Sequence, residues 1–353
     1  MKSIAYFSVI GYHRGARQRA QHICRTFVKN GWNAAFIEPG LHNPPYFSDH
    51  IYVCSPIISP KRRLPSMQIS LSEAGDVVEW IMAQEGPVTL YVGCLYWIDL
   101  VRKLKGLRDD ITIVYDILDS FWDFSDLSAY RNELMSVHMQ LLQLADHVLY
   151  TSSAMKDMLH GREAHHVRNA CWFEQFDIPL NKESPPVVGY AGTIADWFDV
   201  EGAMKVVDAG LNLELVGTCS IKLPQKLLDC HIGTVNWDGL AKVMSRWSCG
   251  TIMHKMNTLT DRADHTKLYE HMALGIPIVA YPSTSSKYIV NDIVKTNAKD
   301  VDLLTLTTDY VPSILYQIED DSDGKIARRK EWAKKNTWDD RYKQISEIIL
   351  STK

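Results

Sequence analysis

One pattern that occurs twice constrains the fold of this chain more than any other feature. An apolar run at residues 4–10 is followed by a glycine-containing loop and an amphipathic helix at residues 16–29. The same order restarts with an apolar run at residues 187–191 and a helix at residues 200–209. Another apolar run follows each helix, and a strand–helix–strand order of this kind joins parallel strands. The sequence therefore predicts an α/β protein with two doubly wound domains.

The length of the chain and the position of its linker agree with two domains. A chain of 353 residues can form two domains of ordinary size. Residues 177–186 are polar and contain three prolines, as is typical of an interdomain linker. We predict an N-terminal domain at residues 1–178 and a C-terminal domain at residues 187–336.

Residues 264–280 read as a helix, a glycine stop and a buried strand. Apolar side chains recur at helical spacing as far as residue 274, so one side of this helix can face a core. Asp264 or Thr266 can cap the helix start, and Gly275 ends it. The apolar run that follows suits a strand of a parallel sheet.

Two charged residues lie near the start of this predicted helix. Lys267 falls in the first turn, where free backbone N–H groups and the helix dipole already attract an anion. Glu270 follows three residues later on the same side and can accept hydrogen bonds from a diol. A cation, a helix start and a carboxylate at this spacing suit a diphosphate with a sugar ring beyond it, which is a nucleotide. The alternative is a solvated helix with a chance Lys/Glu pair.

The segment TKLYEHMALGIPIVA resembles the donor-nucleotide segment of GT-B glycosyltransferases. The resemblance implies that Glu270 binds the ribose and that Lys267 and Thr266, at the helix start, hold the diphosphate. It also implies the GT-B fold, in which two Rossmann-like domains face each other across a cleft. The donor is then expected on the second domain and the acceptor on the first.

Two further segments carry the same resemblance. RGARQRAQHICRTFVKNGWNAAFIEPG resembles the start of bacterial GT-B enzymes of surface-polysaccharide assembly, of the teichuronic-acid and xanthan type. Arg19 stands at or next to a position where those enzymes have proline. Residues 165–176 resemble the end of a GT-B amino-terminal domain, with Ala170 where glycine is usual. The N-x-W-D-x-R motif at residues 336–341 resembles the tail of GT-B enzymes, which implies that a helix at residues 337–353 crosses back onto the first domain.

The segment VVGYAGTIADWFD resembles the first strand and loop of a GT-B donor domain. Gly192 and Thr193 are small, so the backbone there can approach a diphosphate and a sugar. No basic residue follows before Lys205, so the phosphate charge is expected to fall on Lys267, on Lys255 or on helix N–H groups. An ordinary strand-to-helix turn is the alternative for this glycine loop.

The segment at residues 115–126, YDILDSFWDFSD, combines four aspartates with aromatic residues and resembles a stretch of the same transferases. A carboxylate beside aromatic rings loses contact with water, which raises its pKa and suits it to take a proton from a sugar hydroxyl. We predict Asp119 as the first candidate for this base and Asp116 as the second. A helix cap or an Asx turn is the alternative for Asp126 and Asp123.

His13 is a third candidate for a catalytic role. It follows the first predicted strand at its carboxyl end, which is where ligands bind in open α/β sheets. A solvated loop histidine is the alternative. Paired aspartates also bind hard cations, but the resemblance implies that donor binding needs no metal. We therefore expect neither a metal site nor a cofactor, and a nucleotide-diphosphate sugar, with UDP as the first choice, as the donor substrate.

Composition limits the partners and the location. The formal net charge of −4 gives no general attraction to nucleic acid or to anionic lipid. Seven scattered cysteines without metal-ligand spacing suit reduced thiols in a cytoplasmic protein. No signal peptide is recognisable, and no apolar segment approaches the roughly 20 residues that span a bilayer. We expect a cytoplasmic protein, with the inner membrane surface as an option and only peripheral membrane contact.

Together these features predict transfer of a sugar from a nucleotide-diphosphate sugar to an acceptor hydroxyl, in surface-polysaccharide or glycolipid assembly. A hydroxymethylated DNA base is the second acceptor, as for phage GT-B enzymes that transfer glucose or arabinose. The basic residues 61–63 and Trp97 would then form a local DNA face. A non-catalytic nucleotide-sugar binder or a GT-B epimerase is the third hypothesis. If the reaction inverts the anomeric centre, Asp119 or Asp116 is the base; if it retains it, the leaving phosphate can take the proton.

Overall fold

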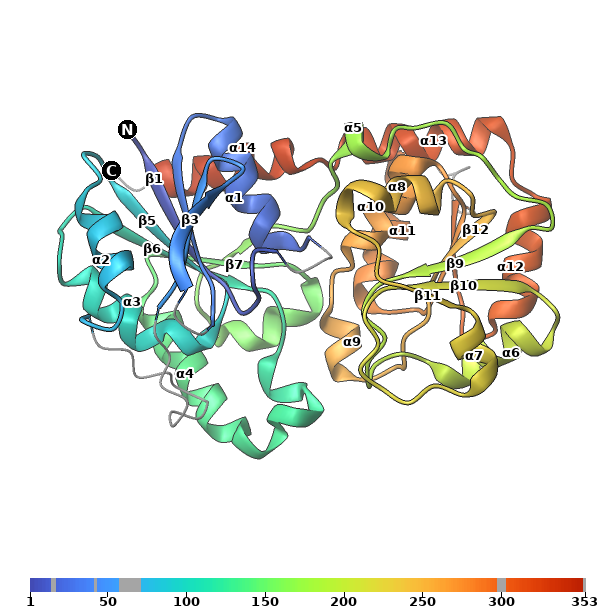
Figure 1. The fold of residues 1–353 in the computed structure, drawn as a ribbon, viewed down its shortest axis with the longest axis horizontal. Helices are drawn as coiled ribbons and strands as arrows, with labels where there is room; N and C mark the ends of the chain where they lie inside the picture. Colours follow the sequence, from blue (N-terminus) through green and yellow to red (C-terminus); the bar gives the residue numbers. More distant parts are fainter. Residues whose placement is uncertain (14–16, 41–42, 57–70, 297–302, 352–353) are drawn as a thin grey trace. The chain divides into compact units, whose positions relative to one another are not determined.

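The computed structural model describes residues 1–13, 17–40, 43–56, 71–296 and 303–351 (Figure 1). Its internal contacts divide the chain into two compact units. Unit 1 comprises Met1–Thr151, Met155–Arg168 and Arg341–Lys353, and unit 2 comprises Ser152–Ala154 and Asn169–Asp340. The boundaries expected at residues 178 and 187 lie after the division at Arg168 and Asn169. The basic cluster at residues 61–63 lies outside the described residues.

Among the described residues, unit 1 contains an eight-stranded sheet with the order β3-β4-β2-β1-β5-β6-β7-β8. Its strands are β1 (Ser3–Phe7), β2 (Asn33–Ile37), β3 (Asn43–Ser48), β4 (Ile51–Ser55), β5 (Val88–Val92), β6 (Ile111–Ile117), β7 (His147–Tyr150) and β8 (His165–His166). All neighbours are parallel except β3 and β4. The chain goes from β1 to β2 on one side and returns to β5 on the other, so the carboxyl ends of β1 and β5 form the switch point where such sheets bind ligands.

Helices cover both faces of this sheet. They are α1 (Arg19–Lys29), α2 (Gly75–Met82), α3 (Ile98–Lys105), α4 (Arg131–Leu144) and the part of α14 (Trp338–Leu350) that belongs to unit 1. Successive strand residues point to opposite faces, and one set of them joins α2, α3 and α4 in a single apolar core. α1 packs on the other face, where Phe27 contacts Trp32 and Tyr342 of α14 edge to face.

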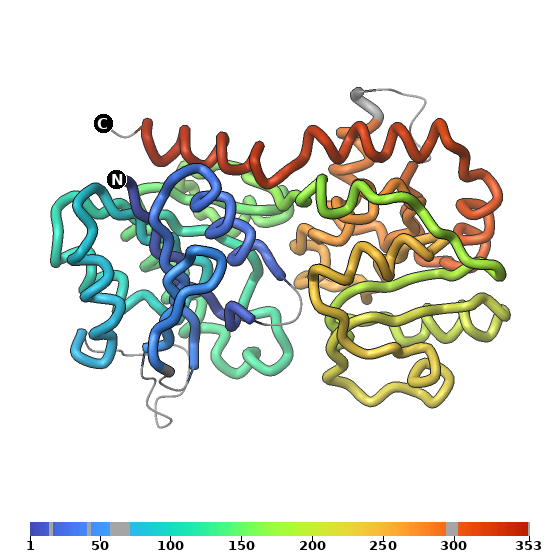
Figure 2. Tube along the Cα trace, turned by 45° about the horizontal axis from the view of Figure 1, so that its top comes forward, coloured from blue at the N-terminus to red at the C-terminus, as the bar shows by residue number. Residues whose placement is uncertain are grey.

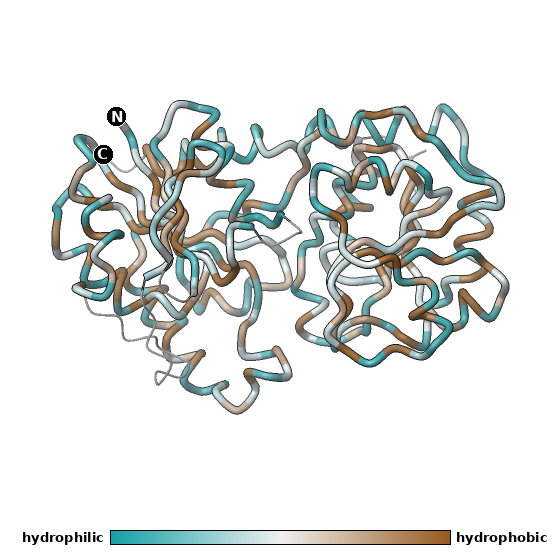
Figure 3. Tube along the Cα trace, in the orientation of Figure 1, coloured by the Kyte–Doolittle hydropathy of each residue, from teal (hydrophilic) through white to brown (hydrophobic). Residues whose placement is uncertain are grey.

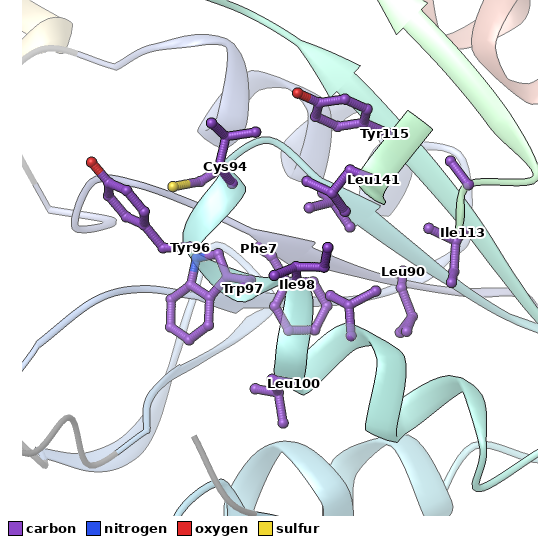
Figure 4. Close-up of a cluster of buried hydrophobic side chains, with 14 of the residues drawn as sticks. Phe7, Leu90, Cys94, Tyr96, Trp97, Ile98, Leu100, Ile113, Tyr115 and Leu141 are labelled. Carbon is purple, nitrogen blue, oxygen red and sulfur yellow. The ribbon is translucent and has the colours of Figure 1, made fainter. Parts of the chain in front are cut away.

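Trp97 was expected on a local DNA face, and that prediction is wrong, because its side chain is fully buried in the unit 1 core. Figure 4 shows its indole near Phe7 of β1 and Ile98 of α3, with Leu141 of α4 on the same face of the sheet. The ring centroids of Trp97 and Phe7 are 5.9 Å apart, and the indole N–H donates to the carbonyl of Ser8 at 2.7 Å. One side chain therefore fixes the carboxyl end of β1 and the start of α3 together.

Among its described residues, unit 2 contains a six-stranded sheet with the order β11-β10-β9-β12-β13-β14, in which all neighbours are parallel. The strands are β9 (Val187–Ala191), β10 (Asn212–Val216), β11 (His231–Gly233), β12 (Cys249–Ile252), β13 (Ile278–Ala280) and β14 (Leu304–Leu306). The chain leaves β9 toward β10 and later returns beside it as β12. The carboxyl ends of β9 and β12 therefore form the second switch point.

The helices of unit 2 form one layer on each face of its sheet. They are α5 (Phe173–Phe176), α6 (Val200–Asp208), α7 (Gln225–Asp229), α8 (Trp237–Met244), α9 (Thr258–Arg262), α10 (Thr266–Leu274), α11 (Thr284–Thr296), α12 (Tyr310–Glu319) and α13 (Asp323–Lys334). One apolar core joins the sheet to α8, α10, α11 and α13, and the other joins it to α6, α7 and α12. Figure 2 shows the course of the chain through each unit as a Cα trace. Figure 3 shows the apolar residues concentrated along the strands of each unit.

The helix predicted in residues 264–280 is α10, and its end is as expected. Gly275 adopts a left-handed conformation with φ of +84°, and a Cβ there would lie 2.7 Å from a methyl carbon of Ile326. The predicted cap is wrong. His265 is the residue that precedes the helix, and neither Asp264 nor Thr266 caps it with its side chain. The Asp264 carboxylate instead accepts hydrogen bonds from three other places in unit 2.

A glycine in β9 generates the first prediction. A Cβ at Gly189 would lie 1.9 Å from the Trp247 ring, which is fully buried. We therefore expect Gly189→Ala to lower the free energy of unfolding of unit 2 by about 1–3 kcal/mol, the usual effect of overpacking a core. Denaturant unfolding followed by tryptophan fluorescence measures it. Gly324→Ala in α13, where the added Cβ makes only ordinary contacts, is the matched control and should change stability by about 0.5 kcal/mol or less. Equal stability of both variants would refute the close packing at β9.

Candidate functional site

The loop that leaves β9 approaches the start of α10 closely. A Cβ at Gly192 would lie 2.2 Å from the Nζ atom of Lys267 and 3.4 Å from the hydroxyl of Tyr190. Gly192 has φ of +154°, and Gly217 at the end of β10 has φ of +137° with its missing Cβ directed at the Gly192 carbonyl. Glycine is required at both positions, because any side chain would push the lysine or the neighbouring strand away.

Lys267 carries a half-buried ammonium group at this place. Its Nζ atom lies 4.8 Å from the centroid of the Tyr190 ring, which is a cation–π distance. Within the part of the chain that the structure describes, it forms no hydrogen bond or ion pair. Burial lowers the pKa of Lys267 to about 8, and the charge of Glu270 opposes that shift in part. The site therefore holds a cation that no protein anion neutralises by contact.

Backbone N–H groups without acceptors occur in the loop after β9 and at the start of α10. Gly192 and Ile194 donate to Val216 and Thr218, which continue the pairing of β9 with β10. The N–H of Thr193, between them, has no acceptor among the described residues. The first N–H groups of α10 also lack acceptors within the helix, as at any helix start. Together with Lys267, whose ammonium lies beside Gly192, these donors are suited to an anion.

Glu270 lies one turn further along α10 and is buried, with 7% of its surface exposed. Burial raises its pKa to about 7, while the charge of Lys267 and the nearby Trp237 side chain act in the opposite direction. Among the described residues it forms no ion pair with Lys267 or with any other cation. A carboxylate kept from water without a counter-charge in contact is an acceptor for hydroxyl groups of a ligand.

Asp264 fixes the chain just before α10. Its carboxylate accepts hydrogen bonds from the backbone N–H of Asn169 at 2.7 Å, from Tyr269 at 3.1 Å and from Ser285 at 2.7 Å. The Asn169 side chain donates to the Asp264 carbonyl. These contacts hold the start of α10 to the segment that enters unit 2 and to α11, so Lys267 and Glu270 sit on a rigid support.

The other candidates from the sequence occupy different environments in unit 2. Thr266 is the first residue of α10 and is half-buried, and Thr193 accepts a hydrogen bond from Thr218 at 3.3 Å between their hydroxyl oxygens. Lys255 is exposed, and its ammonium donates to the Asp196 carbonyl at 2.8 Å. It supports the loop after β9, and no contact among the described residues brings it to Lys267.

In unit 1, Asp116 has an environment different from that predicted for a base. It is buried at the end of β6, and Arg19 of α1 binds both of its oxygens, at 2.7 and 3.2 Å. Arg19 also donates to the Arg168 carbonyl at 3.0 Å. A carboxylate held in a buried two-point ion pair cannot take up a proton without leaving the arginine unpaired. This ion pair disfavours the role of second base, which stays a prediction for Asp116. Its partner, Arg19, was noticed in the sequence only as a departure from a family pattern.

Asp119 lies three residues after Asp116 and is unpaired. It is half-buried, and among the described residues its carboxylate forms no hydrogen bond or ion pair. Burial raises the pKa of Asp119 to about 6. The next residues, Phe121 and Trp122, are buried, and the Trp122 ring packs on His138 at 5.1 Å between centroids. This is the environment that the sequence predicted for a proton acceptor.

The remaining aspartates and His13 do not join Asp119 through any contact among the described residues. Asp123 pairs with Arg131 at 2.9 Å. His13 is exposed in the loop after β1, where its ring stacks on Tyr46 at 5.4 Å.

The described part of the chain contains neither a cluster of metal-ligating side chains nor a helix able to cross a membrane. No three His, Cys, Asp or Glu side chains there are grouped closely enough to hold a metal ion. All seven cysteines are free thiols in the structure. No helix in the described ranges combines the length and apolar character needed to cross a membrane.

Comparison with known proteins supports the fold. No protein-family model matches the sequence, and no curated protein matches it. Solved structures do match. HepE of Anabaena, solved with UDP-glucose, has a TM-score of 0.66 at 14% identity, over 99% of both chains. An alpha-glucosyltransferase (AGT) solved with UDP has a TM-score of 0.66 at 13% identity, over 99% of both chains. An alpha,alpha-trehalose-phosphate synthase (UDP-forming) of Burkholderia xenovorans, solved with glucose-6-phosphate, has 0.64 at 8% identity, over 99% of both. The predicted α/β fold of GT-B type, built of two Rossmann-like units, is confirmed.

The contrast between the two aspartates gives a prediction for stability. Asp116→Asn leaves the Arg19 charge buried without its partner, so we expect a loss of about 3–5 kcal/mol in the free energy of unfolding. Asp119→Asn should leave stability equal or higher at pH 8. The pKa of Asp119 is raised in the folded protein from 3.8 to about 6, so its ionised form destabilises the fold increasingly as pH rises through that range. Denaturant titration of both variants at pH 5 and pH 8 measures these effects. A costly Asp119→Asn at pH 8 would contradict the unpaired carboxylate.

Proposed function

We propose that this chain is a glycosyltransferase that moves a sugar, a hexose, from a UDP-sugar to a hydroxyl group of a carbohydrate acceptor. The single observation that carries the proposal is the unpaired ammonium of Lys267 at the start of α10, beside a glycine loop and one turn from the buried Glu270. The GT-B fold shared with solved glycosyltransferases supports it.

The diphosphate is assigned to Lys267, Thr266 and the glycine loop at Gly192 and Thr193. The ammonium approaches the glycine loop, the Thr193 N–H has no acceptor among the described residues, and the first turn of α10 has free N–H groups. During transfer the bond from the anomeric carbon to the phosphate oxygen breaks, and negative charge grows on that oxygen. Donors that are already in position stabilise this charge without reorganisation. Because the phosphate charge meets a lysine and N–H groups, we propose that no metal or other cofactor is required, and turnover should persist in EDTA.

The ribose is assigned to Glu270. One helix turn separates it from Lys267, which suits the distance between a diphosphate and the hydroxyls of the attached ribose. An ionised carboxylate accepts hydrogen bonds from a diol, and charge-assisted bonds of this kind are stronger than neutral ones. Lys255 remains a weaker proposal, since its ammonium already binds the Asp196 carbonyl.

UDP-glucose is the first donor to test. HepE was solved with UDP-glucose, AGT with UDP, and a protein of E. coli with UDP-2-fluoro glucose. This support comes from likeness of fold at low identity, so a panel of nucleotide sugars belongs in the first experiment.

In unit 1, Asp119 is assigned as the base that accepts the proton of the acceptor hydroxyl. A pKa of about 6 keeps it ionised at neutral pH and still basic enough to accept a proton. This role applies if the anomeric centre is inverted. A solved trehalose-6-phosphate synthase is described as transferring with retention. In a retaining reaction the leaving phosphate can take the proton, and Asp119 would then bind the acceptor.

The acceptor is proposed to be a growing surface polysaccharide or a lipid-linked sugar, bound by unit 1. A lipid-linked acceptor would bring this chain to the inner membrane surface as a peripheral protein, which co-sedimentation with lipid vesicles tests. The formal net charge of −4 disfavours a DNA acceptor, because duplex binding depends on neutralising phosphates. A nucleotide-sugar binder or an epimerase would give no acceptor-dependent product.

Substitution in α10 tests the function directly. Lys267→Met and Glu270→Ala should each weaken UDP binding by about 10–100-fold, the usual effect of losing a charged hydrogen bond. Titration calorimetry with UDP and release of UDP from UDP-glucose, with and without sugar acceptors, measure binding and turnover. Lys205→Met and Glu201→Ala remove an exposed ion pair of α6 and are the matched controls, with no change expected. Unchanged UDP affinity in both α10 variants would refute the donor site.

Asp119→Asn tests the proposed base. It should abolish turnover without unfolding the protein, and unchanged turnover would refute the assignment of Asp119.

The pKa of Lys267 predicts how UDP binding depends on pH. The diphosphate is attracted by the ammonium form, which is lost as pH rises through about 8. UDP affinity should therefore fall between pH 7.5 and pH 9.5, approaching about tenfold per pH unit above that pKa. Lys267→Arg, which stays charged over this range, should bind UDP with little dependence on pH. A flat profile for the unchanged protein, or the same slope in both, would contradict the assignment of Lys267.

A further inference from the structure

A hydrogen-bonded chain of three residues lies directly under the glycine loop. The Tyr190 hydroxyl oxygen is 3.1 Å from the carbonyl oxygen of Thr193 and 3.1 Å from Nε2 of His254. A carbonyl oxygen can only accept, so the single hydroxyl proton of Tyr190 goes to Thr193. Nε2 of His254 must therefore carry a proton and donate it to the Tyr190 oxygen.

This direction fixes the tautomer of His254. With the proton on Nε2, a neutral ring has a bare acceptor at Nδ1, and that atom is buried with no partner among the described residues. His254 is 5% exposed and packs edge to face on His265 at 4.7 Å. Burial and the nearby Lys267 hold its pKa well below the ordinary value, so the ring stays neutral.

Tyr190 has a second contact in the same site. The face of its ring lies 4.8 Å from the Lys267 ammonium, while its hydroxyl holds the Thr193 carbonyl. Gly192 lies between Tyr190 and Thr193 in the chain and has no side chain to restrict its peptide groups. The conformation of the loop therefore depends on contacts from outside the loop. If His254 held its proton on Nδ1, Tyr190 would donate to His254, and the Thr193 carbonyl would be released.

We propose that His254 and Tyr190 are positioning residues of the donor site. His254 donates to Tyr190, which commits the tyrosine proton to the Thr193 carbonyl. That contact holds the loop so that the Thr193 N–H and the Lys267 ammonium point to the same place. This role rests on the proposed function, because the loop matters only if an anion binds there.

A similar pair supports the other side of the site. Nε2 of His265 is 2.7 Å from the Tyr281 hydroxyl, which donates to the Thr260 carbonyl. By the same reasoning, His265 donates from Nε2. Burial and the charge of Lys267 lower the pKa of both histidines, so both are neutral at neutral pH and Lys267 keeps its charge.

Single and double variants test the chain of hydrogen bonds. His254→Leu and Tyr190→Phe should each raise the Kd for UDP by about 5–20-fold, with circular dichroism unchanged, because each cuts one link. The double variant should bind UDP with the same Kd as the single variant that binds it less tightly, since both substitutions interrupt the same chain of hydrogen bonds. His254→Gln, whose side-chain amide can donate near the position of Nε2, should recover most of the affinity. Tyr310→Phe, at another buried tyrosine in unit 2, is the matched control.

The outcomes separate this inference from the function on which it rests. Unchanged protein that binds UDP, together with variants that bind it equally well, would overturn the positioning role alone; so would additive losses. Unchanged protein that fails to bind UDP would overturn the function and this role together. An independent readout is the ¹⁵N NMR spectrum of the full chain with ¹⁵N-labelled histidine. The signal of His254 is the one that is lost in His254→Gln. We expect a neutral ring with the proton on Nε2 at pH 6, and a proton on Nδ1 would refute the chain.

Discussion

The proposed site depends on one electrostatic situation: an ammonium and a carboxylate share one helix turn without touching. Lys267 and Glu270 are both withdrawn from water, which lowers the pKa of the first and raises that of the second. Burying unpaired charges is unfavourable for folding. Such an arrangement is therefore expected where a bound ligand supplies the charged and hydrogen-bonding partners that solvent and protein do not. A ligand that is anionic at one end and carries hydroxyl groups at the other meets both residues.

The rest of unit 2 keeps these two charges apart and in place. Gly192 and Gly217 let the strand ends approach the lysine, and Gly275 ends α10 where β13 must begin. Asp264 ties the start of α10 to the surrounding elements with hydrogen bonds that no ligand needs to provide. Unit 1 shows the opposite use of charge, since the Arg19–Asp116 pair is fully satisfied and structural, whereas Asp119 is left open.

The parts of the fold and site that could be predicted are those determined by local sequence. The period of α10, its glycine stop and the spacing of Lys267 and Glu270 lie within one short segment, and the structure has them as expected. Arg19 and Asp116 are 97 residues apart, so no local pattern joins them, and their ion pair could not be predicted from the sequence. The cap at Asp264 failed because its carboxylate is engaged by Asn169, 95 residues away. Short elements such as β11 and α7 carry too few residues to show a period.

The most direct test of the central claim is a crystal structure of the full chain with UDP-glucose. The account predicts the diphosphate within hydrogen-bonding distance of Lys267 Nζ and the Thr193 N–H, with the ribose hydroxyls on Glu270. A nucleotide bound elsewhere, with the Lys267 ammonium still facing only Tyr190, would contradict it.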